Sequence, residues 1–330
     1  MRFGRYRDGY GALRVGVIGD DVVHPLEGVS DLVVLFDANA ATLREAGAAA
    51  LRRSSDVTSI EGLEFLAPIE PRTVRDFYAF EDHVRAGRAW RGLAMDPLWY
   101  EQPAFYFSNP YAAMGEGDVA VPPGCSNFDF ELEVAAIVGV GGADVSPREG
   151  EELVIGYCVM NDWSARDLQR REMPLSMGPV KGKDSATSLG PWIVTKDELD
   201  DARDANGYDL EMSCLVNGRL YSRARWSDVY WSFGEMVAYA ARGTEVRPGD
   251  VLGSGTCGTG CILELGATYS PEEFPWLVSG DEVVASVERL GSLRSRVVPG
   301  RDLVPLRTPS APIPHPIGVT GEPTSYHDAS

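Results

Sequence analysis

The sequence predicts a mostly β protein of the α+β class, with a small N-terminal domain followed by a larger one. Short β-patterned runs recur along the chain, among them LRVGVIG, AFYFS, ELVIGYCVMND and DEVVASVERLG. Gly and Pro separate these runs at points where strands would turn. The sequence VNGR at residues 216–219 predicts a hairpin, because Asn-Gly adopts the positive φ angles of a type I′ turn.

Three segments of the chain differ in composition. Residues 1–70 combine short apolar runs with the alanine-rich stretch ANAATLREAGAAALRRS, which predicts a small β-rich domain with one helix. Residues 71–296 are dense in strand patterns, and the stretch WSDVYWSFGEMVAYAARG at 226–243 is their best helix candidate, with a polar entry and a Gly stop. Residues 297–330 are rich in Pro and small polar residues, which predicts an extended tail.

Charge and cysteine content narrow the class of protein. The 49 Asp and Glu residues exceed the 30 Lys and Arg residues, and the net charge of -19 disfavours nucleic acid and anionic membranes as partners. Neither a membrane-length apolar run nor a signal-peptide pattern is present, so a cytoplasmic location is expected. The five cysteines lack CxxC spacing and sequence-adjacent histidines, which argues for reduced packing residues rather than disulfides or zinc.

The stretch NFDFELEVAAIVG at 127–139 resembles a strand that enters a core, yet it places Asp129, Glu131 and Glu133 at alternate positions. Side chains at such positions share one face of a strand. At roughly 4 Å separation and an effective dielectric near 20, each like-charged pair costs about 4 kcal/mol. A solvated edge would relieve this repulsion, but the apolar residues that follow favour burial. A hard divalent cation with oxygen ligands is the other explanation.

Several residues elsewhere in the chain are further candidates for a functional site. Asp162 follows a buried strand, where it could be a metal ligand or a helix N-cap. Lys181 and Lys183 alternate with glycines, either in a solvent loop or where the backbone lets a charge approach a ligand. His83 is the one histidine within 71–296 and is a candidate base, with a structural role as the alternative. Asp76 precedes it by seven residues.

Residues 71–292 resemble the fumarylacetoacetate hydrolase (FAH) family through FELEVAAIVG, MNDWSARDLQ, GPVKGKDSATSLGPWIV and GSGT followed by ILEL. The resemblance implies a mixed β-roll catalytic domain of the FAH type and a divalent metal, with Mg²⁺ ahead of Ca²⁺ or Mn²⁺. It also implies a small carboxylate or dicarbonyl substrate and a homodimer, and the aromatic-rich DPLWYEQPAFYF gives the homodimer modest support.

The activity that the resemblance implies is metal-dependent hydrolysis of a C–C bond in a 1,3-diketo or acylpyruvate-type 2-oxo acid. Water is activated by His83, and the leaving enolate is held by the metal. An isomerase, tautomerase or decarboxylase of a related 2-oxo or 2-hydroxy-dienoate acid is the nearest alternative. A noncatalytic, metal-stabilised binding protein is the alternative from another class.

The resemblance also assigns roles to single residues by motif. His83 resembles the base and Glu264 the acid that orients it, while Lys183 and Gln169 resemble donors to the leaving enolate. Met173 stands where the fumarylacetoacetase branch has a substrate-contacting tyrosine, so fumarylacetoacetate itself is not implied as the substrate. Asp129 is left for a structural role beside the metal. The implied metal ligands are Asp76, Glu131, Glu133 and Asp162, and the implied substrate contacts are Tyr78, Arg91, Tyr106, Arg166 and Thr256.

Overall fold

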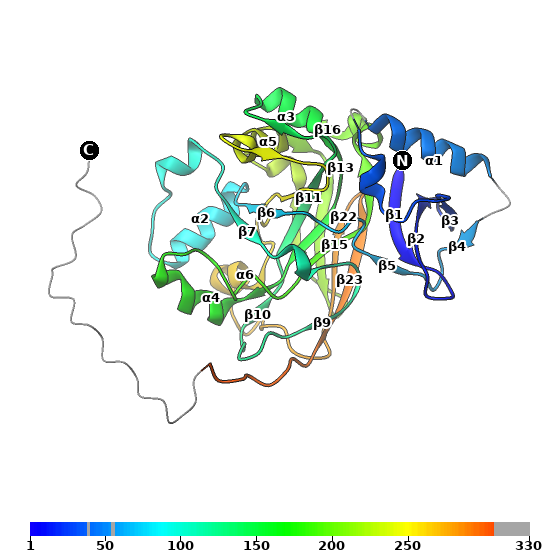
Figure 1. Ribbon diagram of the computed structural model, residues 1–330. Coiled ribbons are helices and arrows are strands. Elements are labelled where there is room, and N and C mark those ends of the chain that lie inside the picture. The colour runs from blue at the N-terminus through cyan, green and yellow to red at the C-terminus, as the bar shows by residue number, and fades with distance from the viewer. Residues whose placement is uncertain (38–39, 54–56, 307–330) are drawn as a thin grey trace.

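Two stacked β-sheets form the body of the protein. The computed structural model describes residues 1–37, 40–53 and 57–306, and Figure 1 shows their arrangement. The larger sheet has twelve strands, and the smaller one, of five strands, packs against the central strands of the larger. The mostly β, α+β class predicted from the sequence is confirmed.

The larger sheet has the order β4-β3-β2-β1-β15-β13-β11-β21-β6-β7, with β5 paired to β1 and β8 paired to β15. Strand β11 pairs antiparallel with both β13 and β21, and β21 pairs parallel with β6. The strands are β1 (Arg2–Arg7), β2 (Leu13–Ile18), β3 (Val22–Pro25), β4 (Thr58–Ser59), β5 (Glu64–Leu66), β6 (Val74–Phe77), β7 (Phe105–Ser108), β8 (Ala113–Met114), β11 (Leu132–Val138), β13 (Val154–Asp162), β15 (Thr187–Thr195) and β21 (Val251–Gly253).

The smaller sheet has the order β19-β18-β22-β23-β9. The predicted VNGR hairpin joins β18 to β19, and Asn217 and Gly218 have φ angles of 51° and 76°, as a type I′ turn requires. This prediction is confirmed. The strands are β9 (Gly117–Ala120), β18 (Glu211–Val216), β19 (Arg219–Arg225), β22 (Glu282–Val287) and β23 (Gly291–Val298). Shorter pairs are β12 (Gly142–Ala143) with β20 (Glu245–Val246) and β16 (Arg203–Asp204) with β17 (Gly207–Tyr208).

Strand β11 is covered on both faces, which explains its unbroken apolar run. Val134 and Ala136 face the core between the two sheets. Ala135 and Ile137 face a second core beneath helix α1 (Ala41–Arg52) and the N-terminal strands. Because neighbouring side chains of a strand point to opposite faces, a strand buried on both sides needs apolar residues at every position.

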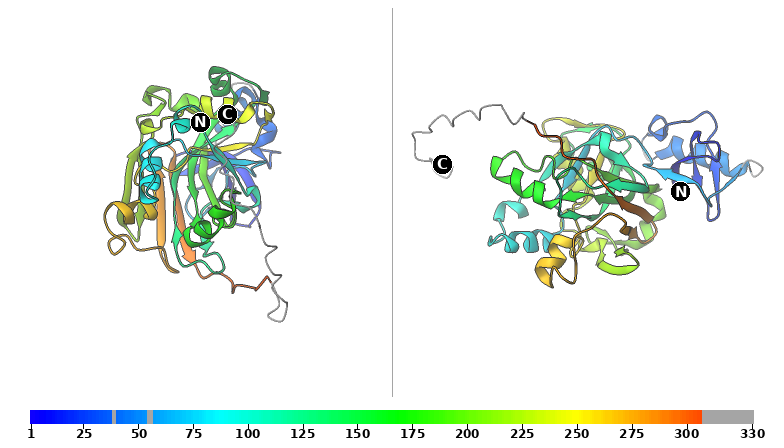
Figure 2. Two further views of the ribbon diagram at one scale, coloured as in Figure 1. Left: turned by 90° about the vertical axis from the view of Figure 1, so that its left-hand side faces the viewer. Right: turned by 90° about the horizontal axis from the view of Figure 1, so that it is seen from below.

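The N-terminal strands extend the larger sheet. Strand β1 pairs with β2 on one side and with β15, more than 180 residues later, on the other. These strands and α1 project at one end of the molecule, on the right of Figure 1 and in the right view of Figure 2. The division into a 1–70 domain and a 71–296 domain stays a prediction.

Helices gather in two places around the sheets. Helices α2 (Glu81–Trp90), α4 (Arg166–Glu172) and α6 (Ile262–Thr268) lie at the end remote from the N-terminal strands (Figures 1 and 2). Helices α3 (Pro147–Leu153) and α5 (Phe233–Ala241) pack on each other at the top of Figure 1. No helix in the described ranges has the length and apolar character to cross a bilayer.

The helix predicted over 226–243 begins later than expected. Trp226–Asp228 form a separate 3₁₀ turn, and α5 starts only after Ser232. Ser232 and Glu235 form a capping box, in which each side chain accepts a hydrogen bond from the other residue's backbone N–H. The helix ends at Ala241, and Gly243 follows with a φ of 69°.

The strand predicted over 127–139 is interrupted. Phe128 and Asp129 form the short strand β10, which pairs with β14 (Ser164–Ala165), and β11 begins only at Leu132. Asp129 therefore belongs to a small separate sheet. At the other end of the chain, β23 continues to Val298, and residues 299–306 form no helix or strand. The rest of the predicted tail, 307–330, lies outside the described residues.

Candidate active site

Four carboxylates from different parts of the larger sheet meet at one point. Asp76 lies on β6, Glu131 just before β11, Glu133 on β11, and Asp162 at the end of β13. One oxygen of each lies within 4.8 Å of the others, and all four side chains are buried. We call these four residues the carboxylate cluster. They are the four residues that the family resemblance implied as metal ligands. Glu131 and Glu133 are both buried, so neither lies at a solvated edge.

Strand pairing brings the carboxylate cluster together. Asp162 follows Asn161, which lies opposite Leu132, and the backbone N–H of Asp162 donates to the carbonyl of Glu131 at 3.1 Å. Asn161 accepts the N–H of Glu131 at 2.9 Å, so it fixes the interrupted segment. On the other side, β21 and β6 run parallel and place Asp76 opposite Gly253. A Cβ at position 253 would lie 2.5 Å from the Asp76 carboxylate, so glycine is needed there.

Cationic and hydroxyl donors surround the cluster. Lys183, 4% exposed, contacts Glu131 and Asp162 through Nζ. The Tyr106 hydroxyl donates to Asp76 at 2.7 Å and also contacts Asp162. Lys183 is therefore a buried cation of the site, whereas Lys181 is exposed, as a solvent-loop lysine would be. Tyr106, assigned by resemblance to the substrate, here bonds two of the four carboxylates.

Burial and mutual repulsion shift the proton affinities of the carboxylates. Burial, with the Asp162 charge, raises the pKa of Asp76 to about 7. Burial and the Asp76 charge also raise the pKa of Glu133 well above its usual range. Burial alone would raise the pKa of Glu131 too, but Arg166 and Lys183 outweigh it and hold that pKa low. Burial also raises the pKa of Asp162. Three of the four carboxyls thus hold protons more tightly than free carboxyls when no cation compensates them.

The carboxylate cluster fits a hard divalent cation. The buried atoms Asp76 Oδ1 and Asp162 Oδ1 have no hydrogen-bond partner among the described residues. Unpaired buried oxygens are costly, and a bound cation would satisfy both. The donor set is made of oxygen alone, the set that Mg²⁺ and Ca²⁺ prefer.

His83 and Glu264 form a pair beside this cluster. His83, on α2, lies with Nδ1 2.8 Å from Oε2 of Glu264, on α6. The other oxygen of Glu264 accepts the backbone N–H of Thr259 at 2.7 Å. Both side chains are buried, and the Tyr78 ring lies edge-on to the His83 ring with centroids 5.7 Å apart. A histidine oriented by a carboxylate can act as a general base.

Asp129, the third acid of the motif, joins two parts of the site. Its carboxylate accepts the N–H groups of Ile262 and Leu263 at the start of α6, at 2.7 and 3.1 Å. It also accepts Nε–H of Arg166 at 2.8 Å, and Arg166 reaches Glu131 with Nη2 at 2.6 Å. Arg166 is thus held between two carboxylates of the protein. Sequence reasoning placed Asp129 beside the metal but could not find its partner helix.

The remaining predicted residues lie at different distances from the cluster. Thr256 is buried, with Oγ1 3.4 Å from Glu133. Gln169 is half-buried and accepts a hydrogen bond from Arg166 at 3.2 Å. Arg91 is exposed at the end of α2, where its Nε–H donates to the Gly87 carbonyl at 3.0 Å. Arg91 contacts none of the four carboxylates, although its charge acts on Tyr78.

Cys261 is a site neighbour that the sequence analysis missed. Its sulfur lies within 4.8 Å of a ring nitrogen of His83 and an oxygen of Glu131. No histidine lies near Cys261 in the sequence, but His83 approaches it in space across 178 positions of sequence. Its position three residues before Glu264 was the available signal.

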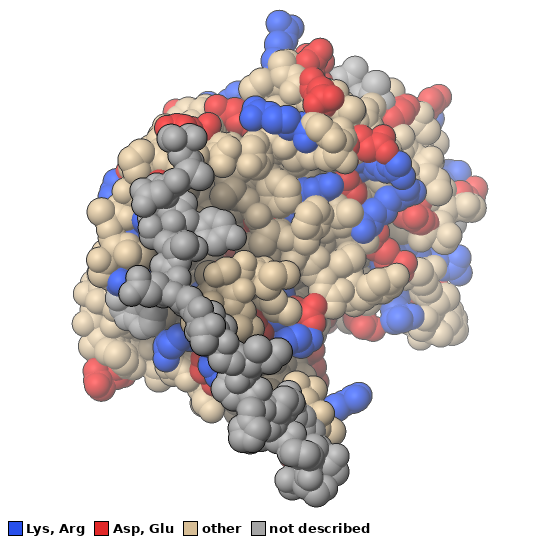
Figure 3. All heavy atoms as spheres, turned by 60° about the vertical axis from the view of Figure 1, so that its left-hand side comes forward, with Lys and Arg blue, Asp and Glu red and all other residues tan. Residues whose placement is uncertain are grey.

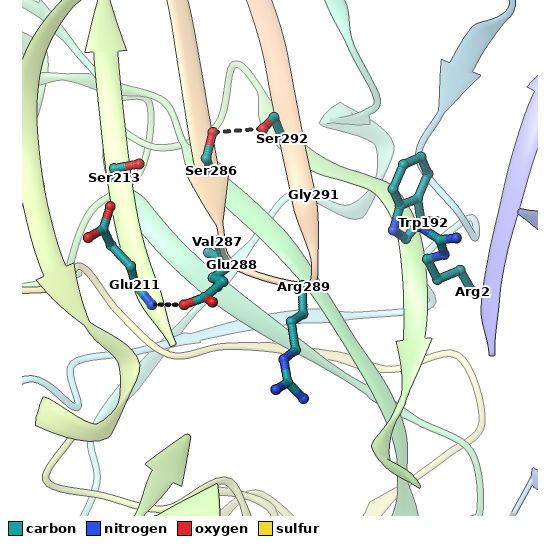
Figure 4. Close-up of a pocket in the computed structure, with 10 residues that line it drawn as sticks. All are labelled: Arg2, Trp192, Glu211, Ser213, Ser286, Val287, Glu288, Arg289, Gly291 and Ser292. Carbon is teal, nitrogen blue, oxygen red and sulfur yellow. Dashed lines mark hydrogen bonds between the residues drawn. The ribbon is translucent and has the colours of Figure 1, made fainter. Parts of the chain in front are cut away.

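A separate surface depression has a volume of about 600 Å³ and shares no residue with the carboxylate cluster. It is lined by β18, the β22–β23 turn and Trp192 of β15, with Glu288 and Arg289 at the turn (Figure 4). On the face of the molecule in Figure 3, acidic and basic side chains are interspersed. The negative net charge therefore forms no single extended patch on that face.

Comparison with known proteins identifies the family. Residues 72–298 match the family described as fumarylacetoacetate (FAA) hydrolase C-terminal, and the chain belongs to the FAH family. Enzymes of this family include hydrolases, isomerases and tautomerases, and they commonly use a divalent metal.

Curated relatives carry several activities in their names. Fumarylacetoacetase of Arabidopsis thaliana is 29% identical over 290 residues, covering 72% of this chain and 68% of the relative. Oxaloacetate tautomerase YisK of Bacillus subtilis is 28% identical, covering 60% and 62%. Maleylpyruvate hydrolase of Aquipseudomonas alcaligenes is 33% identical, covering 55% and 54%. The matched region thus spans 54% to 68% of these relatives' own lengths.

Solved structures share the fold. The fumarylacetoacetate hydrolase of Exiguobacterium antarcticum superposes with a TM-score of 0.69 at 23% identity, covering 91% of this chain and 100% of the other. The maleylpyruvate hydrolase of Sphingobium gives a TM-score of 0.67 at 22% identity with the same coverage. At this level of identity the comparison establishes the FAH-type fold.

Proposed function

We propose that the protein is a metal-dependent hydrolase that cleaves a C–C bond in an acylpyruvate-type 2-oxo acid. The observation that carries the proposal is the His83–Glu264 pair, which lies beside the carboxylate cluster and shares Glu131 as a neighbour. Asp76, Glu131, Glu133 and Asp162 would hold the cation, with Mg²⁺ the first choice. When bound, the cation supplies positive charge that stabilises the enolate of the leaving group.

In the proposed reaction, Nε2 of His83 takes a proton from water, and the resulting hydroxide attacks the acyl carbonyl remote from the carboxylate. The C–C bond to the pyruvate moiety breaks, and its electrons form an enolate. Lys183 and Gln169 donate hydrogen bonds to the developing negative charge. His83 returns the proton to the enolate carbon, so a carboxylic acid and pyruvate leave. Tyr78, Arg91, Tyr106, Arg166 and Thr256 remain candidates for substrate contact.

The test is product analysis with a panel of acylpyruvates, in excess Mg²⁺ and in excess chelator. We expect a carboxylic acid and pyruvate in the Mg²⁺ arm alone. The same reaction in deuterated water reports exchange at the carbon between the two carbonyls. Exchange without any cleavage would contradict hydrolysis and favour the tautomerase alternative.

The tautomerase or isomerase alternative has support of its own. The Bacillus subtilis relative is named an oxaloacetate tautomerase. Lys183 and the Tyr106 hydroxyl lie against the carboxylate cluster, where they could move a proton to or from an enolate without activating water. A decarboxylase would use the same donors. The presence of the His83–Glu264 pair favours hydrolysis over these alternatives and over a noncatalytic binding protein.

We also propose that the protein acts as a homodimer. Strand β7 is the last strand of the larger sheet, and Phe107 on it is 63% exposed. An edge strand that carries an exposed aromatic ring is a common association surface. Light scattering at micromolar concentration tests the proposal, with Phe107→Lys as the disrupting variant and Leu220→Lys, on β19, as a matched exposed control. A monomeric, active wild-type protein would contradict it.

A further inference from the structure

A second group of ligand-type side chains lies against the carboxylate cluster and shares one member with it. His83, Glu131 and Cys261 each place one nitrogen, oxygen or sulfur atom within 4.8 Å of the other two. All three side chains are buried, and Cys261 is 0% exposed. The proposed hydrolysis uses His83 but gives the Cys261 thiol no role.

Among the described residues, the Cys261 thiol and one ring nitrogen of His83 have no hydrogen-bond partner, whereas the two oxygens of Glu131 contact Arg166 and Lys183. Cys261 occupies the N-cap position of α6 but makes no capping hydrogen bond, because Asp129 already accepts the first N–H groups of that helix. Within the described parts of the chain the thiol has no hydrogen-bond partner. The Nδ1 atom of His83 is engaged by Glu264. Nε2 is therefore the nitrogen left for a further ligand.

This donor set differs in chemistry from the carboxylate cluster. Imidazole nitrogen, thiolate sulfur and one carboxylate oxygen are the ligands that Zn²⁺ takes, whereas Mg²⁺ and Ca²⁺ take oxygen. In tetrahedral geometry, zinc bonds of about 2.0–2.3 Å place two ligand atoms about 3.3–3.8 Å apart. The three ligand atoms, each within 4.8 Å of the others, would move closer together by side-chain rotation on binding.

We propose that His83 Nε2, Cys261 Sγ and a carboxylate oxygen of Glu131 form a Zn²⁺ site. On binding, the S–H bond of Cys261 breaks, the sulfur keeps the electron pair for the metal, and the proton leaves to solvent. Occupation removes Nε2 from its role as base, so Zn²⁺ inhibits the enzyme. Inhibition by Zn²⁺ rests on the proposed function of His83 as the base, whereas the binding of Zn²⁺ does not depend on that function.

The binding test uses Co²⁺ as a spectroscopic substitute for Zn²⁺ in protein kept in excess Mg²⁺. Coordination by a thiolate gives Co²⁺ a charge-transfer band in the near ultraviolet, which oxygen ligands alone do not give. We expect this band in the wild-type protein and its loss when Zn²⁺ is added. Absence of the band in the wild type would overturn the proposal. This test uses only the wild-type protein, so it does not depend on whether a variant folds.

Two cysteine variants locate the site. In Cys261→Ser we expect no thiolate band and Zn²⁺ affinity weaker by roughly 10- to 100-fold or more, since even residues that only support metal ligands are worth that much. Cys125→Ser removes the one cysteine that is not fully buried and should bind Zn²⁺ as the wild type does. Unchanged affinity in Cys261→Ser, or a loss in Cys125→Ser alone, would overturn the proposal.

The activity arm is separate from the binding arm. In excess Mg²⁺, we expect Zn²⁺ to inhibit the wild type reversibly, and Cys261→Ser to need roughly tenfold more Zn²⁺ or above for the same fractional inhibition. Equal inhibition of both proteins would assign the effect to the carboxylate cluster and overturn the inhibitory role. If acylpyruvates prove not to be substrates, the Co²⁺ and affinity measurements still decide whether the site exists.

Discussion

His83 and Glu264 face each other across two helices, with Nδ1 of the histidine 2.8 Å from Oε2 of the glutamate. An ionised carboxylate only accepts hydrogen bonds, so this contact places the imidazole proton on Nδ1 and the lone pair on Nε2. The N–H of Thr259 holds the other glutamate oxygen at 2.7 Å. The orientation of the histidine is therefore set from α6, and Nε2 is ready to accept a proton.

The first prediction concerns this pair. His83→Ala should lose roughly 10²- to 10⁴-fold in kcat on an acylpyruvate, the usual worth of a positioned general base. Glu264→Gln should lose less, because it weakens the orientation of the histidine without removing it. Steady-state kinetics and Mg²⁺ calorimetry on each variant provide the measurement. His24→Ala, on β3, is the control, and cleavage within a few-fold of wild type in His83→Ala would refute the assigned role.

The second prediction concerns the metal ligands. Glu133 lies against Asp76, accepts the Gly255 N–H at 3.1 Å and lies 3.4 Å from Thr256 Oγ1. Among the described residues it pairs with no Lys or Arg, so Glu133→Gln leaves no cation unpaired. We expect roughly 10- to 100-fold weaker Mg²⁺ binding by calorimetry, or a larger loss, with little change in fold. Glu131→Gln should in addition destabilise the protein, because Arg166 and Lys183 both pair with Glu131.

The surface variant Glu288→Gln, in the depression of Figure 4, is the control for this series. It should bind Mg²⁺ as tightly as the wild type. Wild-type Mg²⁺ affinity in Glu133→Gln would mean that the cation is held elsewhere.

Many residues of the candidate site could be predicted from the sequence, because they belong to short local motifs. Glu131 and Glu133 are recognisable as acids in an otherwise apolar strand pattern. The hairpin at Asn217 follows from the local φ preferences of Asn and Gly. Partnerships between distant segments could not be predicted in this way. The approach of Cys261 to His83 and of Asp129 to α6 depends on how two sheets and three helices pack, and no spacing in the chain encodes it. The interruption of the predicted strand at Phe130, between β10 and β11, likewise depends on packing between distant segments.

The third prediction concerns Asp129, which we expect to act as a positioning residue. It pairs with buried Arg166 and accepts two N–H groups of the helix that carries Glu264. Asp129→Asn should lower the free energy of unfolding by about 3 kcal/mol, since it leaves a buried charge with one partner fewer. It should lower kcat with little change in KM, because Glu264 would orient His83 less well.

Chemical denaturation and kinetics measure both effects. Asp118→Asn, an exposed acid on β9, should change neither quantity. A stable Asp129→Asn protein with wild-type kcat would show that α6 keeps its place without this contact.

The last prediction concerns the pH dependence of stability, and it follows from Asp76. Burial and the Asp162 charge raise the pKa of Asp76 from 3.8 to about 7 in the folded protein without metal. The folded state then binds this proton more tightly than the unfolded chain, so the contribution of Asp76 to stability falls as pH rises from about 4 to about 7.

Mg²⁺ competes with the same proton, and its stabilising effect should therefore grow over the same pH window. The measurement is Tm in chelator and in excess Mg²⁺ at several pH values. We expect the Tm difference between the two conditions to be small near pH 5 and to increase toward pH 8. Asp76→Asn has no such proton to lose, so the fall of stability with pH in chelator should be shallower in that variant. Glu133 and Asp162, whose pKa values burial also raises, contribute further dependence in the same direction. A Tm difference that is constant from pH 5 to pH 8 would show that Mg²⁺ does not bind where Asp76 titrates.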